Sequence, residues 1–351
     1  MAKGTLAFVL HAHLPFVRHP EFDRFLEEAW FFEAITETYI PLLRRFMKLA
    51  DEGVKFGVTL SVSPCLLAML EDSLLQERYR QRLRELIELS DKELTRLKHD
   101  GHFKYLASWY RNFFSESLEF FDRYDGRLSV ALKQLHHSGH LEVISCAGTH
   151  GFLPQLAAFP GNVEGQLVNG FAYFEEVFGF APSGMWVPEC AYYPGLDERM
   201  RKHGIRYFFT ESAGIEHASN APLYGVHAPL FTPSGVAAFG RDAGSTKQVW
   251  SADTGFPGDG DYREFYRDIG QELDFEYLRP YMCGDVRSDT GIKYHRITGP
   301  GMHKEGYSPE AAREKAAIHA GQFLFQRTAH IEYLDSMMAT RPVIVAPFDA
   351  V

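Results

Sequence analysis

The chain has 351 residues, a formal net charge of -10 at pH 7 and a hydrophobic fraction of 45%. This length and apolar content can bury a large core, which suits one large α/β barrel or two smaller domains. The acidic balance, without a Lys/Arg run interleaved with aromatics, argues against a nucleic-acid partner and favours a neutral one. Aromatic residues make up 14% of the chain and suit stacking on sugar faces, although most must fill the core.

The cysteines and the N-terminus indicate the compartment. Cys65, Cys146, Cys190 and Cys283 are widely spaced, with no CxxC pair and no Cys/His cluster of zinc type, so we expect reduced thiols. The apolar run near the N-terminus is too short for a secretory signal and is interrupted by His11. No stretch approaches the roughly 20 apolar residues of a membrane-spanning helix. The sequence therefore predicts a soluble, cytoplasmic protein that does not bind a membrane.

Apolar runs rich in strand-forming residues recur along the chain. The first is continuous, as in a strand that is covered on both faces. Helical patterns lie between most of the runs, which favours a parallel α/β sheet or barrel over an antiparallel sandwich. The predicted strands are residues 6–10, 55–62, 141–146, 184–187, 207–210, 236–239 and 343–346.

A helical insert interrupts this alternation after the second predicted strand. Residues 71–100 carry apolar side chains near helical spacing, among them Leu75 and Leu86, with charges elsewhere. The charges are more typical of a solvated helix face than of a partner-binding surface. A second helical stretch, residues 115–140, leads into the third strand. We therefore expect one compact unit with a helical insert at about residues 66–140.

Polar residues follow several of the predicted strands at the point where each strand ends. In a parallel α/β barrel the chemistry collects at the carboxyl ends of strands, because the loops there can vary while the strands hold side chains in place. His11 and His13 follow the first run, and strand alternation points both the same way. His150 follows the third run, Glu189 the fourth and Asp349 the last. These five side chains are the candidate site.

Each candidate has a simpler structural alternative. A single histidine at a strand end more often bonds loop backbone than takes part in catalysis, by about two to one. Three histidines, each bounded by Gly or Pro, shift that balance toward a site. Glu189 could be a charge at a helix N-terminus, and Asp349 could cap a turn. Trp186 stands two residues before Glu189 and favours a sugar-binding role for that strand end.

Five segments of the chain together resemble glycoside hydrolase family 57, and within it the 1,4-α-glucan branching enzymes. They are HAHLPFV at 11–17, SCAGTHGFLP at 145–154, GMWVPEC at 184–190, the stretch at 239–270 that begins FGRDAGS, and APFDA at 346–350. They follow the family's order across essentially the whole chain. The resemblance implies a distorted, TIM-like (β/α)7 barrel over residues 1–351, with a helical insert after the second strand.

The resemblance also implies roles for single residues. Glu189 matches the nucleophile and Asp349 the general acid/base of a retaining mechanism. Three matched histidines line the donor sugar subsite: His11, His13 and His150. Residues matched within the 239–270 stretch contact substrate or lie beside it: Arg241, Trp250 and Gly258. The implied partner is an α-glucan, and the chemistry needs no metal or organic cofactor.

The implied activity cleaves an α-1,4 linkage through a glycosyl-enzyme ester and forms an α-1,6 linkage to another glucan chain. A retaining mechanism needs its two carboxyl groups about 5–5.5 Å apart, and strand ends distant in sequence can meet across a barrel mouth. The acid needs a raised pKa, which burial under bound sugar and a negative nucleophile nearby would supply. We therefore expect Glu189 and Asp349 to share one hollow.

Other activities stay open at this point. A metal-dependent hydrolase such as a polysaccharide deacetylase could use the three histidines as ligands, although no Asp or Glu stands beside the first pair. A 4-α-glucanotransferase or α-amylase of the same family shares the first chemical step. Branching enzymes of this type continue past the equivalent of Asp349 into a helical C-terminal domain. The resemblance therefore implies a C-terminally truncated barrel, whose activity is in doubt, or an inactive glucan-binding remnant.

Overall fold

The computed structural model describes residues 2–299, 301 and 303–350. Within that part of the chain, eight strands form one sheet in the order β6-β7-β5-β4-β3-β2-β1-β8. The strands are β1 (Thr5–Ala12), β2 (Val58–Val62), β3 (Leu141–Cys146), β4 (Gly184–Trp186), β5 (Tyr207–Thr210), β6 (Leu230–Phe231), β7 (Ala237–Gly240) and β8 (Val343–Asp349). Each of the seven predicted runs overlaps one strand of this sheet.

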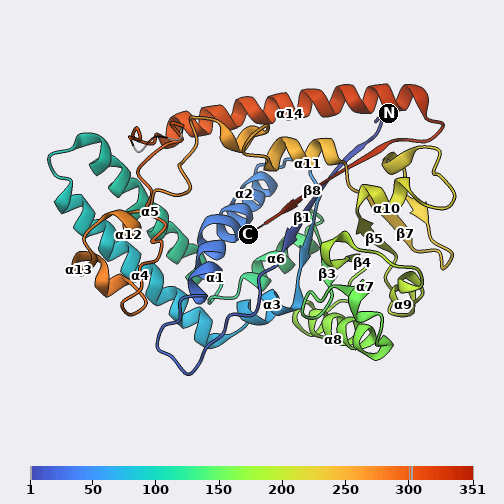
Figure 1. Cartoon of the computed structure of the whole chain (residues 1–351), viewed down its shortest axis with the longest axis horizontal. Helices are drawn as coiled ribbons and strands as arrows, with labels where there is room; N and C mark the ends of the chain where they lie inside the picture. Colours follow the sequence, from blue (N-terminus) through green and yellow to red (C-terminus); the bar gives the residue numbers. More distant parts are fainter. Residues whose placement is uncertain (1, 300, 302, 351) are drawn as a thin grey trace.

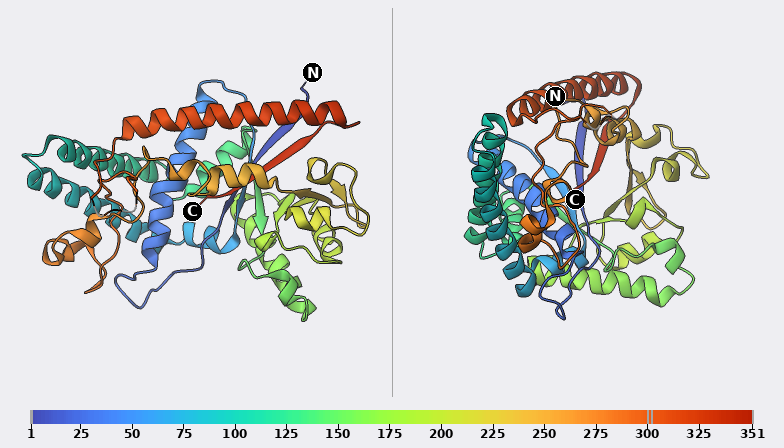
Figure 2. Two further views of the ribbon diagram at one scale, coloured as in Figure 1. Left: turned by 45° about the horizontal axis from the view of Figure 1, so that its top comes forward. Right: turned by 60° about the vertical axis from the view of Figure 1, so that its left-hand side comes forward.

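The sheet is a distorted (β/α)7 barrel, as predicted. In the described part of the chain, seven strands run parallel, and the short β6 pairs antiparallel with β7. The sheet curls, and helices cover its outside (Figures 1 and 2). At the seam between β7 and β8, the Asp242 amide donates to the Val345 carbonyl at 2.8 Å.

The register of the strands brings their carboxyl ends to one edge. His11 on β1 lies opposite Ser61 on β2 and opposite Asp349 on β8. On the other side of the sheet, Cys146 at the end of β3 lies opposite Trp186 at the end of β4. Side chains that follow these strands are therefore neighbours, although they are up to hundreds of residues apart in sequence.

The insert between β2 and β3 is helical, as its pattern predicts. It comprises α3 (Pro64–Leu70), α4 (Ser73–Arg96), α5 (Gly101–Arg123) and α6 (Leu128–His137). The predicted helical stretch 115–140 comprises the end of α5 and all of α6. The break falls at Asp125 and Gly126, whose φ angles of 55° and 81° are left-handed and end an α-helix. In Figure 1, α4 and α5 project from one side of the barrel.

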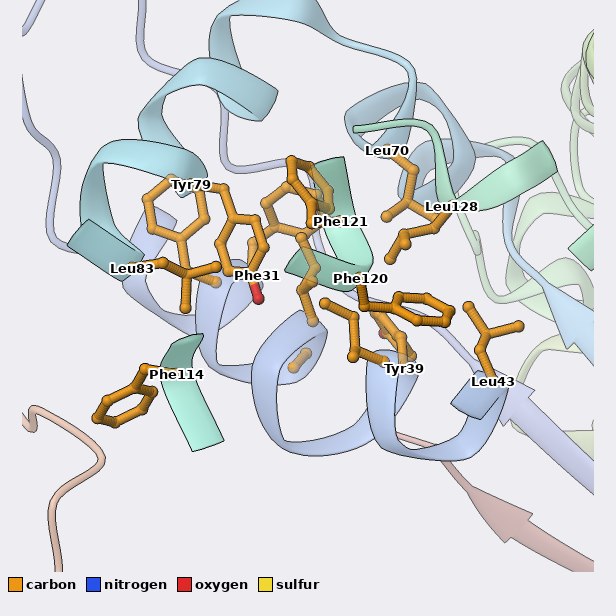
Figure 3. Close-up of a cluster of buried hydrophobic side chains, with 14 of the residues drawn as sticks. Phe31, Tyr39, Leu43, Leu70, Tyr79, Leu83, Phe114, Phe120, Phe121 and Leu128 are labelled. Atoms are coloured by element: carbon orange, nitrogen blue, oxygen red, sulfur yellow. The ribbon is translucent and has the colours of Figure 1, made fainter. Parts of the chain in front are cut away.

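Buried aromatic rings fasten the insert to the first helical segment, α1 (Glu28–Ala34), the π-helical η1 (Ile35–Tyr39) and α2 (Ile40–Asp51). Figure 3 shows Phe31, Tyr79 and Phe121 in this cluster, each at most 1% exposed. The Tyr79 and Phe121 rings meet edge to face, with centroids 4.7 Å apart. The Tyr79 hydroxyl keeps a partner in Thr36 Oγ1 at 2.9 Å. Each buried ring stabilises this junction by about 1.5–3 kcal/mol.

The remaining helices complete the barrel and its outer cover. The long helix α14 lies across the β1–β8 side of the sheet (Figure 1), where Phe8 and Phe323 rings lie 6.0 Å apart. No helix among the described residues is long and apolar enough to cross a membrane. The elements are α7 (Leu153–Leu156), α8 (Pro160–Phe178), η2 (Pro188–Cys190), α9 (Leu196–Lys202), α10 (Ser212–Glu216), η3 (Gly225–His227), α11 (Ala243–Trp250), η4 (Phe256–Gly258), α12 (Ile269–Glu272), α13 (Phe275–Leu278), η5 (Arg279–Tyr281) and α14 (Pro309–Met337).

Candidate active site

A cavity of about 430 Å³ opens at the carboxyl ends of the strands. This volume falls in the range of small-ligand sites. It collects residues from β1, β3, β4, β7 and β8 and from the segments that follow them. Its lining is His11, His13, His150, Trp186, Glu189, Cys190, Arg241, Thr246, Trp250, Pro347, Phe348 and Asp349. The structure thus brings together the sequence-predicted site residues other than Gly258.

Gly258 ends the short helix η4, and the cavity lining described above does not include it. A Cβ at this position would meet the carbonyl oxygen of Ala252 at 1.9 Å, too close for any side chain. The tight packing of this turn therefore accounts for a glycine here. Contact between Gly258 and substrate stays a prediction.

Glu189 lies in a turn with strained, left-handed backbone. It follows β4 and Pro188 in η2, with φ 56° and ψ 21°, and its side chain is 71% exposed. Among the described residues, four other than glycine have positive φ, and three of them are His150, Glu189 and Cys190. Left-handed backbone costs roughly 1–3 kcal/mol per residue and is concentrated at functional sites. The strain here turns the Glu189 carboxylate into the mouth of the barrel.

Asp349 ends β8, directly beside the end of β1. The register pairs it with His11, and the next amide, of Ala350, donates to the His11 carbonyl at 2.8 Å. Burial raises the pKa of the Asp349 carboxyl, the positive charge of Arg241 opposes the rise, and the negative charge of Glu189 adds to it. The two carboxyl groups therefore face the same cavity, and the pKa of Asp349 is raised there.

The three histidines form one stacked group on the cavity wall. The His13 and His150 rings lie 3.8 Å apart at 11°, and His11 Nε2 is 2.9 Å from His150 Nε2. Two ring nitrogens lie near serine hydroxyls: His11 Nδ1 is 3.2 Å from Ser61 Oγ in β2, and His13 Nδ1 is 2.9 Å from Ser63 Oγ directly after β2. These bonds to β2 and to the residue after it fix how the rings face the cavity.

The histidines are neutral at physiological pH. Burial lowers the pKa of His13 to about 4, with a further decrease from His150. Burial also lowers the pKa of His150 to about 4, and it lowers the pKa of His11 well below its ordinary value. Neutral imidazoles can both donate to and accept from sugar hydroxyls, which suits a binding wall. In the part of the chain that the structure describes, no group of three or more His, Cys, Asp or Glu is placed to hold a metal ion.

Two tryptophans border the cavity in different ways. Trp186 is only 5% exposed, and its ring stacks on His11 with centroids 4.5 Å apart. It therefore supports the histidine group more than it offers a free face. Trp250, the last residue of α11, is 59% exposed at the rim. Its ring is the one available for stacking on a sugar.

Sequence reasoning missed several polar residues of this site. Glu211 follows β5, and its Oε1 lies 2.9 Å from Arg241 Nη1. Ser61 and Ser63 alternate at the end of β2, as His11 and His13 do at the end of β1. The rule that polar residues at strand ends form the site would have found all three, because each stands at the carboxyl end of a predicted strand.

An α/β barrel with two interacting carboxyl groups among imidazole and indole rings has the architecture of a glycoside hydrolase. Comparison with known families agrees. Residues 7–300 match the model of glycosyl hydrolase family 57, and the chain belongs to this family.

Two curated relatives are similar to this chain along nearly its whole length. A 1,4-α-glucan branching enzyme of Thermococcus kodakarensis is 33% identical over 376 residues, which cover 99% of this chain and 52% of the relative. A probable 1,4-α-glucan branching enzyme of Mycobacterium tuberculosis is 28% identical over 344 residues, which cover 92% and 59%. The chain thus spans about half the length of the curated relatives that it matches.

Solved structures show the same fold. The structure of the α-amylase AmyC from Thermotoga maritima superimposes with a TM-score of 0.95 at 45% identity, covering 99% of this chain and 67% of that one. The branching enzyme of this family from Pyrococcus horikoshii gives a TM-score of 0.86 at 32% identity, covering 99% and 63%.

Proposed function

We propose that this chain carries the catalytic site of a retaining α-glucan-active enzyme, with Glu189 as nucleophile and Asp349 as general acid/base. One observation carries the proposal: both carboxyl groups line a single cavity, in which burial, with a smaller contribution from the charge of Glu189, raises the pKa of Asp349. A carboxyl group that holds its proton, beside a second carboxyl group in the same cavity, is what the acid and nucleophile roles require.

The first step breaks the glycosidic bond. Asp349 donates its proton to the leaving oxygen while the Glu189 carboxylate attacks the anomeric carbon and forms an ester. The leaving chain departs with a neutral hydroxyl. The neutral histidine wall, with His150 Nδ1 4.0 Å from Glu189 Oε1, can bond the hydroxyls of the glucosyl unit held there.

The second step transfers the glucosyl chain. Esterified Glu189 no longer carries a negative charge, so the pKa of Asp349 falls and its carboxylate becomes a base. Asp349 takes the proton of an incoming hydroxyl, whose oxygen attacks the anomeric carbon and releases Glu189. The configuration is retained because two displacements occur.

The acceptor decides the overall activity, and we propose the 6-hydroxyl of another glucan chain. This makes an α-1,6 branch from an α-1,4 linkage, the activity by which the relatives from Thermococcus kodakarensis and Pyrococcus horikoshii are named. The proposed partner is accordingly an α-glucan. Its first contacts would be the histidine group, Arg241 and the exposed ring of Trp250.

A second candidate is α-amylase activity. The Thermotoga maritima structure, 45% identical to this chain, is described as an α-amylase. Hydrolysis shares the first step and differs only in that water, not a sugar hydroxyl, attacks the ester. The same residues would serve both reactions.

Product analysis after incubation with amylose separates the candidates. A branching enzyme creates α-1,6 linkages while reducing ends stay nearly constant, whereas an amylase raises reducing ends without new α-1,6 linkages. The Glu189→Gln variant should lose either activity by at least about 10³-fold, because it removes the nucleophile. Glu119→Gln, on the exposed face of α5 in the insert, is the matched control and should keep full activity. Full activity in Glu189→Gln would contradict the proposal.

We also propose a cytoplasmic setting. The four cysteines are free, and three of them are buried. Cytosolic thiol systems keep such cysteines reduced. Glucan stores built and remodelled inside cells are the corresponding substrate class.

A further inference from the structure

Glu211 has no role in the chemistry described so far, yet it pairs with a residue of the cavity wall. We propose that Glu211 is a positioning residue, which holds the Arg241 guanidinium at a fixed place beside Asp349 and so tunes how readily Asp349 gives up its proton. This inference rests on the proposed acid/base role of Asp349. It adds a residue outside the cavity lining to the control of the reaction.

Backbone contacts tie Glu211 to the nucleophile's turn. The Glu211 amide donates to the Cys190 carbonyl at 3.3 Å, and Thr210 Oγ1 donates to the same oxygen at 3.0 Å. Cys190 directly follows Glu189 and shares its left-handed backbone. Glu211 therefore keeps a fixed position relative to Glu189.

Arg241 is anchored between the strands on either side of it. Its amide donates to the Thr210 carbonyl at 3.2 Å, and the amide of Asp242 donates to Val345 on β8 at 2.8 Å. The Asp242 carboxylate is held in turn by Arg327 of α14 at 3.0 Å. The backbone of Arg241 is thus fixed, and only its side chain can choose between carboxylate partners.

In the structure the Arg241 guanidinium pairs with Glu211. Arg241 Nη1 lies 2.9 Å from Glu211 Oε1, with 28% of the arginine side chain and 45% of the glutamate side chain exposed. The guanidinium also faces Asp349, because both residues line the same cavity; there burial raises the pKa of the Asp349 carboxyl and the positive charge of Arg241 opposes that rise. The positive charge of Arg241 therefore acts on two carboxyl groups, that of its ion-pair partner Glu211 and that of Asp349.

Other groups around Asp349 do not supply this control. His11, on the adjacent strand β1, is neutral, and so are His13 and His150 across the cavity. Glu189, after β4, acts in the opposite direction, since its negative charge raises the pKa of Asp349. Arg241 is the positive charge that counters Glu189 at this carboxyl.

Two substitutions should therefore shift the acid/base in opposite directions. In Glu211→Gln, Arg241 loses its ion-pair partner and turns toward Asp349, so the pKa of Asp349 falls. In Arg241→Gln, the cation is gone and the pKa of Asp349 rises. The limb of the kcat/KM profile that reports loss of the Asp349 proton should move by about half a pH unit, to lower pH in the first variant and to higher pH in the second.

The test measures kcat/KM on amylose from pH 4 to 9 for wild type, Glu211→Gln, Arg241→Gln and the control Glu216→Gln on α10. Melting temperatures confirm that each variant is folded. Opposite shifts of the basic limb, with the control unchanged, support the inference. A lower rate without a shift, or shifts in the same direction, overturns it. Asp349→Asn is measured in parallel: if it keeps its activity, the proposed function itself fails, whereas an inactive Asp349→Asn with unshifted Glu211→Gln overturns only the role of Glu211.

Discussion

The helical insert and the mouth of the barrel are held by different forces. In the insert, rings such as Tyr79 and Phe121 are almost fully buried and contact one another and the first helical segment. At the mouth, the catalytic candidates are polar, the Glu189 side chain is 71% exposed, and three residues accept left-handed backbone. Apolar packing stabilises the insert. At the mouth, strained backbone lowers the local stability but orients the carboxyl and imidazole groups.

The two regions meet at Ser63. Its hydroxyl accepts from the Leu66 amide at the start of α3, the first helix of the insert, and it lies 2.9 Å from His13 Nδ1 in the cavity. Substitutions in the insert should therefore change stability without changing the reaction, and substitutions at the mouth should do the reverse. A change at Ser63 should do both.

The largest effect is expected at the mouth. Asp349→Asn removes the acid and should reduce kcat/KM on amylose by about 10²–10⁴-fold. The melting temperature should stay within about two degrees of wild type, because the substitution keeps the shape of the side chain. Steady-state rates and differential scanning fluorimetry check both statements. A large fall in the melting temperature would show that the mouth also contributes to the stability of the fold.

The insert should respond in the opposite way. Phe121→Ala leaves a cavity beside Tyr79 and should lower the free energy of unfolding by about 3–5 kcal/mol. The kcat of the protein that remains folded should be unchanged. Urea denaturation followed by fluorescence gives the first quantity, and active-site-normalised rates give the second. A tenfold fall in kcat would contradict the separation of the two regions.

Acid should weaken the mouth before the insert. Buried imidazoles are harder to protonate in the folded protein than in the unfolded chain, where the pKa is about 6.5. Their contribution to stability is therefore complete above about pH 6.5 and is lost as the pH falls toward 4, the pKa of His13 and His150. Unfolding free energies between pH 7 and 4 should decline less steeply in His13→Asn. Equal slopes would argue that these rings are not buried in solution.

The smallest effect is expected for a substitution at Ser63, which contacts both regions. Ser63→Ala removes the cap of α3 and should cost about 1 kcal/mol of stability. It also frees His13 and should raise KM on amylose by a few-fold. Asp100→Ala is the matched control. The Asp100 side chain caps α5 of the insert in the same way, by accepting a hydrogen bond from the Phe103 amide. The control should lose similar stability with KM unchanged; an unchanged KM in both variants would remove Ser63 from the site.

The strands and most of the site could be predicted because both depend on local sequence. A strand covered on both faces is a continuous apolar run, and polar residues at its end stand out against it. His11, Glu189 and Asp349 were found in this way, and the roles given to them stay proposals. Glu211 also follows a predicted strand, but its ion pair with Arg241 depends on how β5 and β7 pair, which no local pattern shows.

Other parts depend on contacts that no local pattern shows. In helix α14, polar and apolar residues are mixed around the helix circumference. The sequence therefore shows no apolar stripe that would predict this helix. Residues 259–299, 301 and 303–308 have few regular elements, and distant partners hold them in place. The Tyr277 hydroxyl donates to buried Glu93 of α4 at 2.8 Å, and Arg82 donates to the Tyr281 carbonyl at 2.7 Å. These bonds form only once the insert is folded.

Trapping the covalent intermediate tests the central claim most directly. A 5-fluoro-α-glucosyl fluoride or its maltosyl analogue slows the release of a glycosyl-enzyme, and digestion followed by mass spectrometry locates the ester. We predict a single glycosylated carboxylate, at Glu189, in the wild type and no label in Glu189→Gln. A label on another residue, or continued amylose turnover by Glu189→Gln, would contradict the account.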